Sequence, residues 1–208
     1  TELNFATQKI SICDLGCGRG WIAQQLSGFG DVTAVDLSAE GVRRAQIKWP
    51  HIKFEQGDIT KYRNDDRFDI VVSTEVLEHI EEKKAFFNTA RSLLKPGGHL
   101  IITTPNSKLF SFYKNTDAEM QPLELWPSFS EIRNLASTDF SILRYETFIF
   151  DTFYTGVFRV ISAPKLISLC RTLHIESARR WAHRLFNLGL HQIFHLRYEV
   201  LPENRTGC

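Results

Sequence analysis

The sequence predicts an α/β fold, built on a doubly wound, mainly parallel seven-stranded sheet with a helical insertion near the C-terminus. Strand and helix signals alternate from residue 10 to residue 105, and a glycine-rich turn follows the first strand signal. Such alternation produces βαβ units with right-handed crossovers and helices on both faces of the sheet. The 208 residues, 43% of them hydrophobic, suffice for one domain with a substantial core.

The first half of the chain supplies five strands and three helices. Short apolar runs predict strands at residues 10–15, 31–36, 52–56, 68–73 and 99–104. Helical periodicity predicts helices at residues 21–26, 39–49 and 83–94. Pro50 ends the second helix, the run Lys95-Pro96-Gly97-Gly98 ends the third, and Pro105 ends the fifth strand.

The second half is less regular. Residues 105–127 form a long connection, after which Ser128 and Glu131 make a capping box for a helix to Ala136. Strands are expected at residues 140–150 and 191–200, with one or two helices at 155–188 inserted between them. We therefore divide the chain into an α/β core (1–150), a helical lid or insertion (151–190) and a closing strand with a tail (191–208).

The helical segment mixes apolar residues with arginines, and three interpretations stay open. It is a lid over a pocket, a packing layer or dimer surface, or a helix that touches a membrane surface. The oligomeric state is not predicted.

Composition excludes several classes. A net charge of +1 gives no strong field toward nucleic acid or an anionic membrane. No uncharged apolar run is long enough to span a bilayer, so we expect no transmembrane segment. The four cysteines lack zinc-site spacing and suit a reducing compartment, which predicts a cytoplasmic protein. The chain begins at Thr1, shortly before the first strand, as a fragment lacking its upstream part would.

The glycine-rich turn carries the strongest chemical signal. Asp14-Leu15-Gly16-Cys17-Gly18-Arg19-Gly20 lies between a strand and a helix, where glycines let the backbone turn sharply beside a ligand. Trp21 stands where a dinucleotide fingerprint needs glycine, which disfavours that alternative. A glycine turn without a ligand is the other alternative.

Two later acids follow strand ends. Asp36 ends the second strand, where an acid in nucleoside-binding α/β domains accepts hydrogen bonds from the ribose hydroxyls. Ser38 is the better N-cap of the next helix, which frees Asp36 for this role. After the third strand, Asp58 could accept from an adenine amino group while Ile59 covers the ring; a surface turn is the plain alternative.

Together the strings DLGCGRG, AVDLS, GDI, FDIVVSTEVLEHI and LLKPGGHLIITTPN resemble the class I S-adenosylmethionine (SAM)-dependent methyltransferases, which have a Rossmann-like fold. The resemblance covers roughly residues 8–106. It implies SAM as cofactor, with its methionine end lined by Asp14, Gly16, Gly18 and Gly20. It implies Asp36 for the ribose, Leu37, Asp58 and Ile59 for the adenine, and Glu75 and Val76 near the reacting methyl.

The string Glu75-Val76-Leu77-Glu78-His79 resembles that of ubiquinone-biosynthesis O-methyltransferases and of small-RNA 2′-O-methyltransferases, in which such a trio helps bind a metal. Because the RNA enzymes use a further histidine after the fifth strand, and residues 105–150 contain none, we predict no metal site. Glu78 and His79 then brace the loop, or His79 acts as the general base. Tyr113, His174 and His191 are further candidate bases among which the sequence does not choose.

The expected function is methyl transfer from SAM to a small-molecule acceptor, at an oxygen atom. Such an acceptor must lie in line with the S–methyl bond and lose its proton. No nucleic acid partner is expected, and contact with a membrane surface stays open. The alternatives are an RNA 2′-O-methyltransferase and a SAM-fold binding module without turnover.

Overall fold

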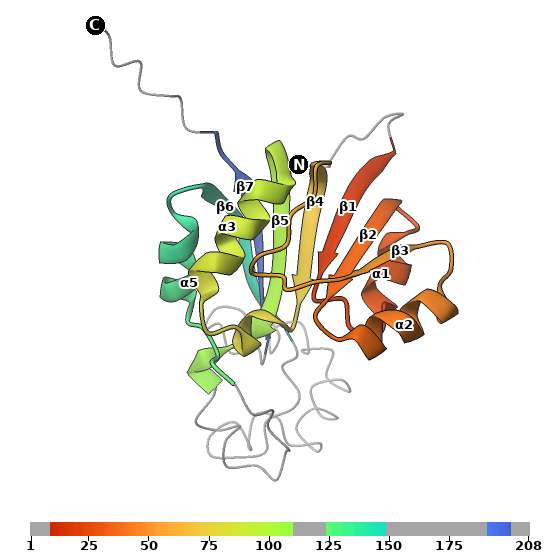
Figure 1. Ribbon diagram of the computed structural model, residues 1–208. Coiled ribbons are helices and arrows are strands. Elements are labelled where there is room, and N and C mark those ends of the chain that lie inside the picture. Colours follow the sequence, from red (N-terminus) through yellow and green to blue (C-terminus); the bar gives the residue numbers. More distant parts are fainter. Residues whose placement is uncertain (1–8, 110–123, 149–190, 201–208) are drawn as a thin grey trace, which may run out of the picture.

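The computed structural model describes residues 9–109, 124–148 and 191–200 (Figure 1). They build one seven-stranded sheet in the order β3-β2-β1-β4-β5-β7-β6. The strands are β1 (Ile10–Leu15), β2 (Gly30–Asp36), β3 (Lys53–Gln56), β4 (Phe68–Thr74), β5 (Leu94–Pro105), β6 (Phe140–Phe148) and β7 (His191–Tyr198). The helices are α1 (Trp21–Leu26), α2 (Ala39–Lys48), α3 (Lys83–Leu93) and α5 (Phe129–Ala136), with 3₁₀ turns η1 (Leu77–His79) and η2 (Ser107–Leu109).

The sheet is mixed rather than wholly parallel. Strands β1 to β5 pair in parallel, whereas β7 pairs antiparallel with both β5 and β6. The seven strands were expected, and β7 closes the sheet between β5 and β6. The expected helical insertion of residues 151–190 lies outside the described residues.

Element boundaries agree with the sequence to within a few residues, with one instructive correction. The fifth strand was expected to begin at His99, but β5 begins at Leu94, immediately after α3. Leu94 already pairs with Phe68, and the register then shifts before His99 pairs with Ile70. The Pro-Gly-Gly run, with Gly97 at φ 75°, therefore forms an irregularity inside the strand and not a loop before it.

Two hydrophobic cores lie on opposite faces of the sheet. On one face Leu15, Val71 and Leu100 pack with α3 and α5. On the other, Ile12 and Val72 pack with α1 and α2. Figure 1 shows α3 and α5 against β4–β7, and α1 and α2 beside β1–β3. The central strands thus bury both faces, as their continuous apolar runs predict.

Side-chain caps fix where two helices begin. The Ser38 hydroxyl accepts from Gly41 N at the start of α2, and the Ser128 hydroxyl accepts from Glu131 N at the start of α5. Each hydroxyl satisfies one of the amide groups left unpaired at a helix N-terminus, as the sequence predicted for both serines. None of the described helices has the length and apolar character needed to cross a membrane.

The topology gathers polar side chains at one edge. Strands β1, β2, β4 and β5 end there, and the antiparallel β7 begins there, with His191 paired opposite Pro105. In open α/β sheets, ligands bind outside the carboxyl ends of the parallel strands. The functional site is therefore sought at this edge.

A core substitution tests this packing. Phe194 on β7 is fully buried and stacks on Phe129 and Tyr145. We expect Phe194→Ala to lower the free energy of unfolding by about 3–5 kcal/mol, because it leaves a cavity. Leu143→Ala, on the exposed side of β6, is the control, with a change within about 0.5 kcal/mol. Equal effects of the two substitutions, measured by urea unfolding, would contradict this account of the core.

Candidate functional site

The turn between β1 and α1 folds back onto β2. Gly16 N and Cys17 N donate to Val35 O at 2.8 and 3.0 Å, and Gly18 N donates to Asp36 Oδ2 at 2.7 Å. Gly16, Gly18 and Gly20 all have positive φ. At Gly16 a Cβ would collide with Val76, whereas at Gly18 it would meet no atom within 4 Å. The turn is thus held in a left-handed conformation, with open space above Gly18.

Asp36 ends β2, and its carboxylate stabilises the turn by accepting hydrogen bonds from backbone amides. Besides the bond from Gly18 N, its Oδ1 accepts from Ser38 N at 2.8 Å. A carboxylate offers about four acceptor positions, so about two remain for a ligand. Asp36 therefore organises the turn and keeps free acceptor positions.

Asp14 is the most deeply buried acid of the turn. It is 0% exposed, and neither carboxylate oxygen has a hydrogen-bond partner among the described residues. Burial raises the pKa of Asp14 to about 7; the backbone amide of Ala23 opposes this shift and the charge of Asp36 adds to it. An unpaired carboxyl group in the interior is costly, and a nearby cation would lower that cost.

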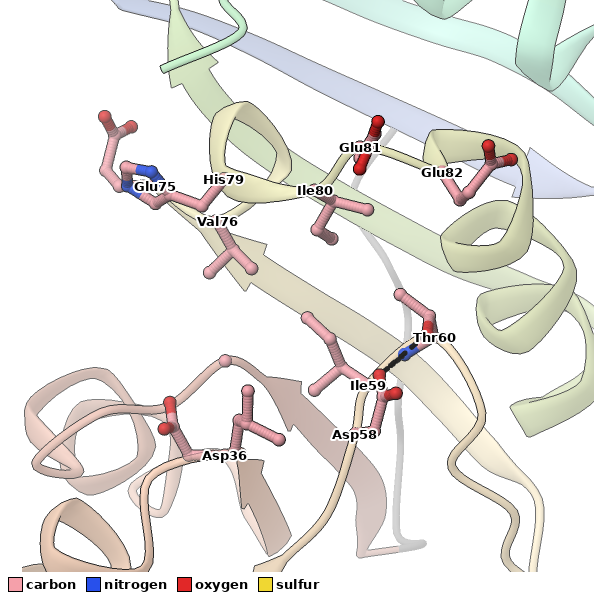
Figure 2. Close-up of a pocket in the computed structure, with 12 residues that line it drawn as sticks. Asp36, Asp58, Ile59, Thr60, Glu75, Val76, His79, Ile80, Glu81 and Glu82 are labelled. Atoms are coloured by element: carbon pink, nitrogen blue, oxygen red, sulfur yellow. Dashed lines mark hydrogen bonds between the residues drawn. The ribbon is translucent and has the colours of Figure 1, made fainter. Parts of the chain in front are cut away.

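A cavity of about 650 Å³ opens in front of the turn at the carboxyl edge (Figure 2). One wall is formed after β2 and β3 and includes Asp36, Asp58 and Ile59. The opposite wall, formed after β4, includes Val76 and Ile80. In Figure 2 the side chains of Val76, Ile80 and Ile59 point into the space between the walls. The full lining comprises Gly16, Asp36, Leu37, Asp58, Ile59, Thr60, Glu75, Val76, His79, Ile80, Glu81 and Glu82.

Asp58 and Leu37 flank the first wall. Asp58 Oδ1 accepts from the Thr60 amide at 2.9 Å and from its hydroxyl at 2.7 Å, and these bonds lower the pKa of Asp58. Leu37 is 69% exposed although it is a large apolar side chain. A charged acceptor beside exposed apolar surface suits a flat, polar-edged ring such as a nucleobase.

Glu75 marks the corner where β4 leaves the sheet. Its φ is 55°, the one positive value at a non-glycine residue within the described ranges. Glu75 N donates to Thr103 O at 2.9 Å, and Glu75 Oε1 accepts from the Thr103 hydroxyl at 2.8 Å. Glu75 Oε2 lies 2.7 Å from His191 Nδ1. Such strained conformations concentrate at functional sites, and here the Thr103 bonds hold one in place.

Glu78 lies deeper, beneath the 3₁₀ turn η1. It is 2% exposed, and its Oε2 accepts from the Thr104 hydroxyl at 2.9 Å. Burial raises the pKa of Glu78 to about 7. His79 follows at the cavity wall, with Nε2 at 3.8 Å from Glu78 Oε1. Glu78 therefore packs η1 onto the end of β5, which agrees with the bracing role considered from the sequence.

Most of the residues predicted at the cofactor meet at this cavity. Of that set, Asp14, Gly18 and Gly20 do not line it. The predicted base His79 does line it. Sequence reasoning missed Thr60, Ile80, Glu81 and Glu82, which carry no motif of their own. It also missed the pairing of Glu75 with His191, which depends on strand register.

No three His, Cys, Asp or Glu side chains in the described part of the chain gather closely enough to hold a metal ion. Glu75, Glu78 and His79, adjacent in sequence, do not converge on one point. The left-handed backbone at Glu75 and the burial of Glu78 direct the two carboxylates to different donors. Glu75 accepts from Thr103, and Glu78 accepts from Thr104.

A sheet of this order, with a glycine turn after β1, an acid at the end of β2 and a cavity at the carboxyl edge, defines a class I SAM-dependent methyltransferase. The family model described as "Methyltransferase domain" matches residues 2–197. The chain belongs to this methyltransferase family, and SAM is its cofactor.

Curated relatives match about half of the chain. A ubiquinone biosynthesis O-methyltransferase of Cereibacter sphaeroides is 32% identical over 116 residues, covering 50% of this chain and 45% of that enzyme. The mitochondrial ubiquinone biosynthesis O-methyltransferase of Rattus norvegicus is 33% identical over 116 residues, covering 50% of this chain and 33% of that enzyme. The matched part thus spans less than half of these relatives.

Solved structures share the fold at lower identity. A SAM-dependent methyltransferase from Mesorhizobium loti aligns with a TM-score of 0.61 at 20% identity, covering 91% of each chain. The N-methyltransferase NodS from Bradyrhizobium japonicum, in complex with S-adenosyl-L-homocysteine, aligns with a TM-score of 0.59 at 15% identity. That alignment covers 91% of this chain and 78% of NodS. These likenesses establish the fold.

The site is chemically suited to SAM, which carries a positive sulfonium and a positive ammonium group. The open space above Gly18 admits a ligand against the backbone, and the unpaired carboxyl of Asp14 lies below the turn. Carboxylates line the cavity from both walls. A cation entering here would meet complementary charge.

Asp36 provides a direct test of cofactor binding. We expect Asp36→Ala to weaken SAM binding about tenfold to hundredfold, because it removes a charged hydrogen-bond acceptor and the support of the turn. Asp31→Ala is the matched control, since Asp31 lies on the same strand and pairs at the surface with Lys9. Isothermal titration calorimetry measures both, and an unchanged Kd for Asp36→Ala would contradict the assignment.

Asp14 predicts a pH dependence of stability. Its pKa is raised in the folded state, so its contribution to stability is full below the unfolded pKa near 3.8 and is lost as the pH rises through about 7. The free energy of unfolding of Asp14→Asn, relative to that of the wild type, should therefore rise by about 2 kcal/mol from pH 5 to pH 8. Urea unfolding at both pH values measures this difference. Asp31→Asn is the exposed control. A difference that stays constant with pH would refute this role of burial.

Proposed function

We propose that this enzyme methylates a hydroxyl oxygen of a small-molecule acceptor. The observation that carries the proposal is the juxtaposition of the cavity with imidazole and carboxylate groups at the ends of β4, β5 and β7. A hydroxyl is a weak nucleophile until its proton is removed, so an oxygen acceptor needs such proton-accepting groups near the methyl.

The cofactor assignments follow the two walls of the cavity. Asp14, Gly16, Gly18 and Gly20 would hold the methionine end, and Asp36 would accept from the ribose hydroxyls. Leu37, Asp58 and Ile59 would bind the adenine, while Glu75 and Val76 would lie beside the methyl group. The exposed apolar surface of Leu37 and the free lone pairs of Asp36 support these roles.

The protein has to position the reactants more than it has to activate them. SAM brings a methyl group that its sulfonium already activates. The protein has to orient the acceptor, exclude water and take up a proton. His79, which lines the cavity, stays a predicted base for that proton.

The names of the relatives support oxygen and a small acceptor. The curated matches are ubiquinone biosynthesis O-methyltransferases, at about one third identity over about half of the chain. Because acceptor specificity in this fold depends on parts beyond the cofactor site, the acceptor itself is not inferred from them. The cytoplasmic location stays a prediction.

An RNA acceptor is the second candidate, and the charge of the cavity argues against it. Asp36, Asp58, Glu75, Glu81 and Glu82 line the cavity, which would repel a phosphate backbone. RNA-binding surfaces instead gather lysine, arginine and aromatic side chains.

Methyl transfer from radiolabelled SAM tests the proposal. The purified chain is offered a catechol, an aliphatic alcohol, a primary amine and a short RNA. We expect label in the catechol or the alcohol, and its loss in Asp36→Ala. Label confined to the amine or to RNA would overturn the proposal.

A further inference from the structure

Resting on the proposed oxygen acceptor, we propose that His191 is the catalytic base and that Glu75, held by Thr103, is its positioning residue. The sequence left His191 as one of several candidates. The observation that selects it is the chain of contacts from β5 through β4 to β7 at the edge of the cavity.

The contact between Glu75 and His191 determines which imidazole nitrogen of His191 can accept a proton. Glu75 Oε2 lies 2.7 Å from His191 Nδ1, a short charge-assisted distance. An ionised carboxylate only accepts, so a proton lying between these two atoms belongs on Nδ1. The Nε2 atom of the neutral ring then carries the lone pair. The pair is therefore arranged to deliver a basic nitrogen in a defined tautomer.

Glu75 is itself held in position from β5. Its second oxygen accepts from the Thr103 hydroxyl at 2.8 Å, and its backbone amide is bound to Thr103 O at 2.9 Å. The left-handed φ of 55° turns the residue out of the line of β4. With both carboxylate oxygens engaged, Glu75 has little freedom to choose another orientation.

His191 is fixed by the strand that it begins. It pairs with Pro105 of β5 on one side and with Phe148 of β6 on the other, and the Phe148 ring lies 5.6 Å from the imidazole. The next residue, Gln192, is fully buried on the opposite face, where its amide donates to Pro105 O and Pro127 O. The backbone beneath the imidazole is thus anchored on both sides.

The position of this pair suits an acceptor and not the cofactor. Glu75 lines the cavity at its β4 end, next to Val76. His191 lies beyond Glu75, on the side of β5 and β7, and does not line the cavity itself. An acceptor that approaches the methyl group from that side would meet the imidazole, which is 22% exposed. Arg144 and Glu146 of β6 are paired with each other.

His79 is the less favourable base. Its Nε2 lies 3.8 Å from Glu78 Oε1, a longer contact than the 2.7 Å between His191 and Glu75. Glu78 is buried and already accepts from Thr104, and burial raises its pKa. Burial thus favours the neutral form of Glu78, which stabilises an imidazolium less than an ionised carboxylate does.

In the proposed reaction, proton transfer accompanies methyl transfer. His191 Nε2 takes the hydroxyl proton as the acceptor oxygen forms its bond to the methyl carbon. The carbon–sulfur bond breaks, and its electron pair stays on sulfur. The products are a methyl ether, a neutral thioether and an imidazolium paired with Glu75, which later releases its proton to water.

The experiment combines kinetics with a readout that needs no acceptor. His191→Asn and His79→Asn are compared with wild type in methyl transfer to a catechol, with SAM affinity from calorimetry. His195→Asn is the matched control, since His195 lies on the same face of β7 and contacts His99 instead. Nitrogen-15 NMR of the imidazole rings reports the tautomer of His191 in wild type, Thr103→Val and Thr103→Ser.

We expect His191→Asn to lower kcat about a hundredfold or more with an unchanged Kd for SAM, since general bases contribute on that scale. His195→Asn should retain most of the rate, and His79→Asn, which alters the cavity wall, should lower kcat less than His191→Asn does. His191 should show the Nδ1–H tautomer in wild type and in Thr103→Ser, and a mixture of tautomers in Thr103→Val, which lacks the anchoring hydroxyl.

Two results would overturn the assignment: full activity in His191→Asn, or an Nε2–H tautomer in the wild type. A general loss of fold is recognised by a lowered thermal midpoint, and His191→Gln then repeats the test. If the wild type methylates amines and no hydroxyl, the proposed function fails. The tautomer still decides the geometry of the Glu75–His191 pair in that case.

Discussion

The parallel pairing of β1 with both β2 and β4 is the constraint on which the site depends. Ile12, Cys13 and Asp14 of β1 pair with both neighbours, so the ends of these strands lie side by side. Both faces of β1 are buried, and a slip of one residue would move Ile12 and Cys13 into each other's cores, which disfavours any other register. The glycine turn, Asp36 and Glu75 then arrive at one edge as a consequence of packing.

Charge at that edge has two distinct functions. Toward β2 and β3, Asp36 and Asp58 bind backbone amides and keep acceptor positions for a ligand. Toward β5 and β7, Glu75 and Glu78 each accept from a threonine of one β-strand, Thr103 and Thr104. Because these threonines alternate between the two faces of β5, one carboxylate faces the cavity and the other faces the core.

The sequence predicted the elements around the glycine turn well, because the signals for these elements are local. The bounds of β1 and α1 agree with expectation, since an apolar run, a glycine turn and a helix start are all local signals. Ser38 and Ser128 cap their helices for the same reason. The sequence located Asp36 at the cavity because this position depends only on where the strand ends.

The pairing of Glu75 with His191 could not be predicted in this way. It joins residues far apart in the chain and requires that β7 insert between β5 and β6 in the observed register. Strand order and register are set by tertiary packing, for which a single sequence offers no local signal. The irregular start of β5 was missed because a Pro-Gly-Gly run is typical of a loop, whereas here Leu94 already pairs with Phe68.

The buried carboxyl of Asp14 has a consequence for ligand exchange. At neutral pH it stands near half-protonation beneath the turn, in surroundings of low polarity where charges act strongly. A positively charged ligand above it would favour the ionised form, so binding of such a ligand would release protons into the solvent. The acid beneath the glycines would then make occupancy of the site depend on the acidity of the surroundings.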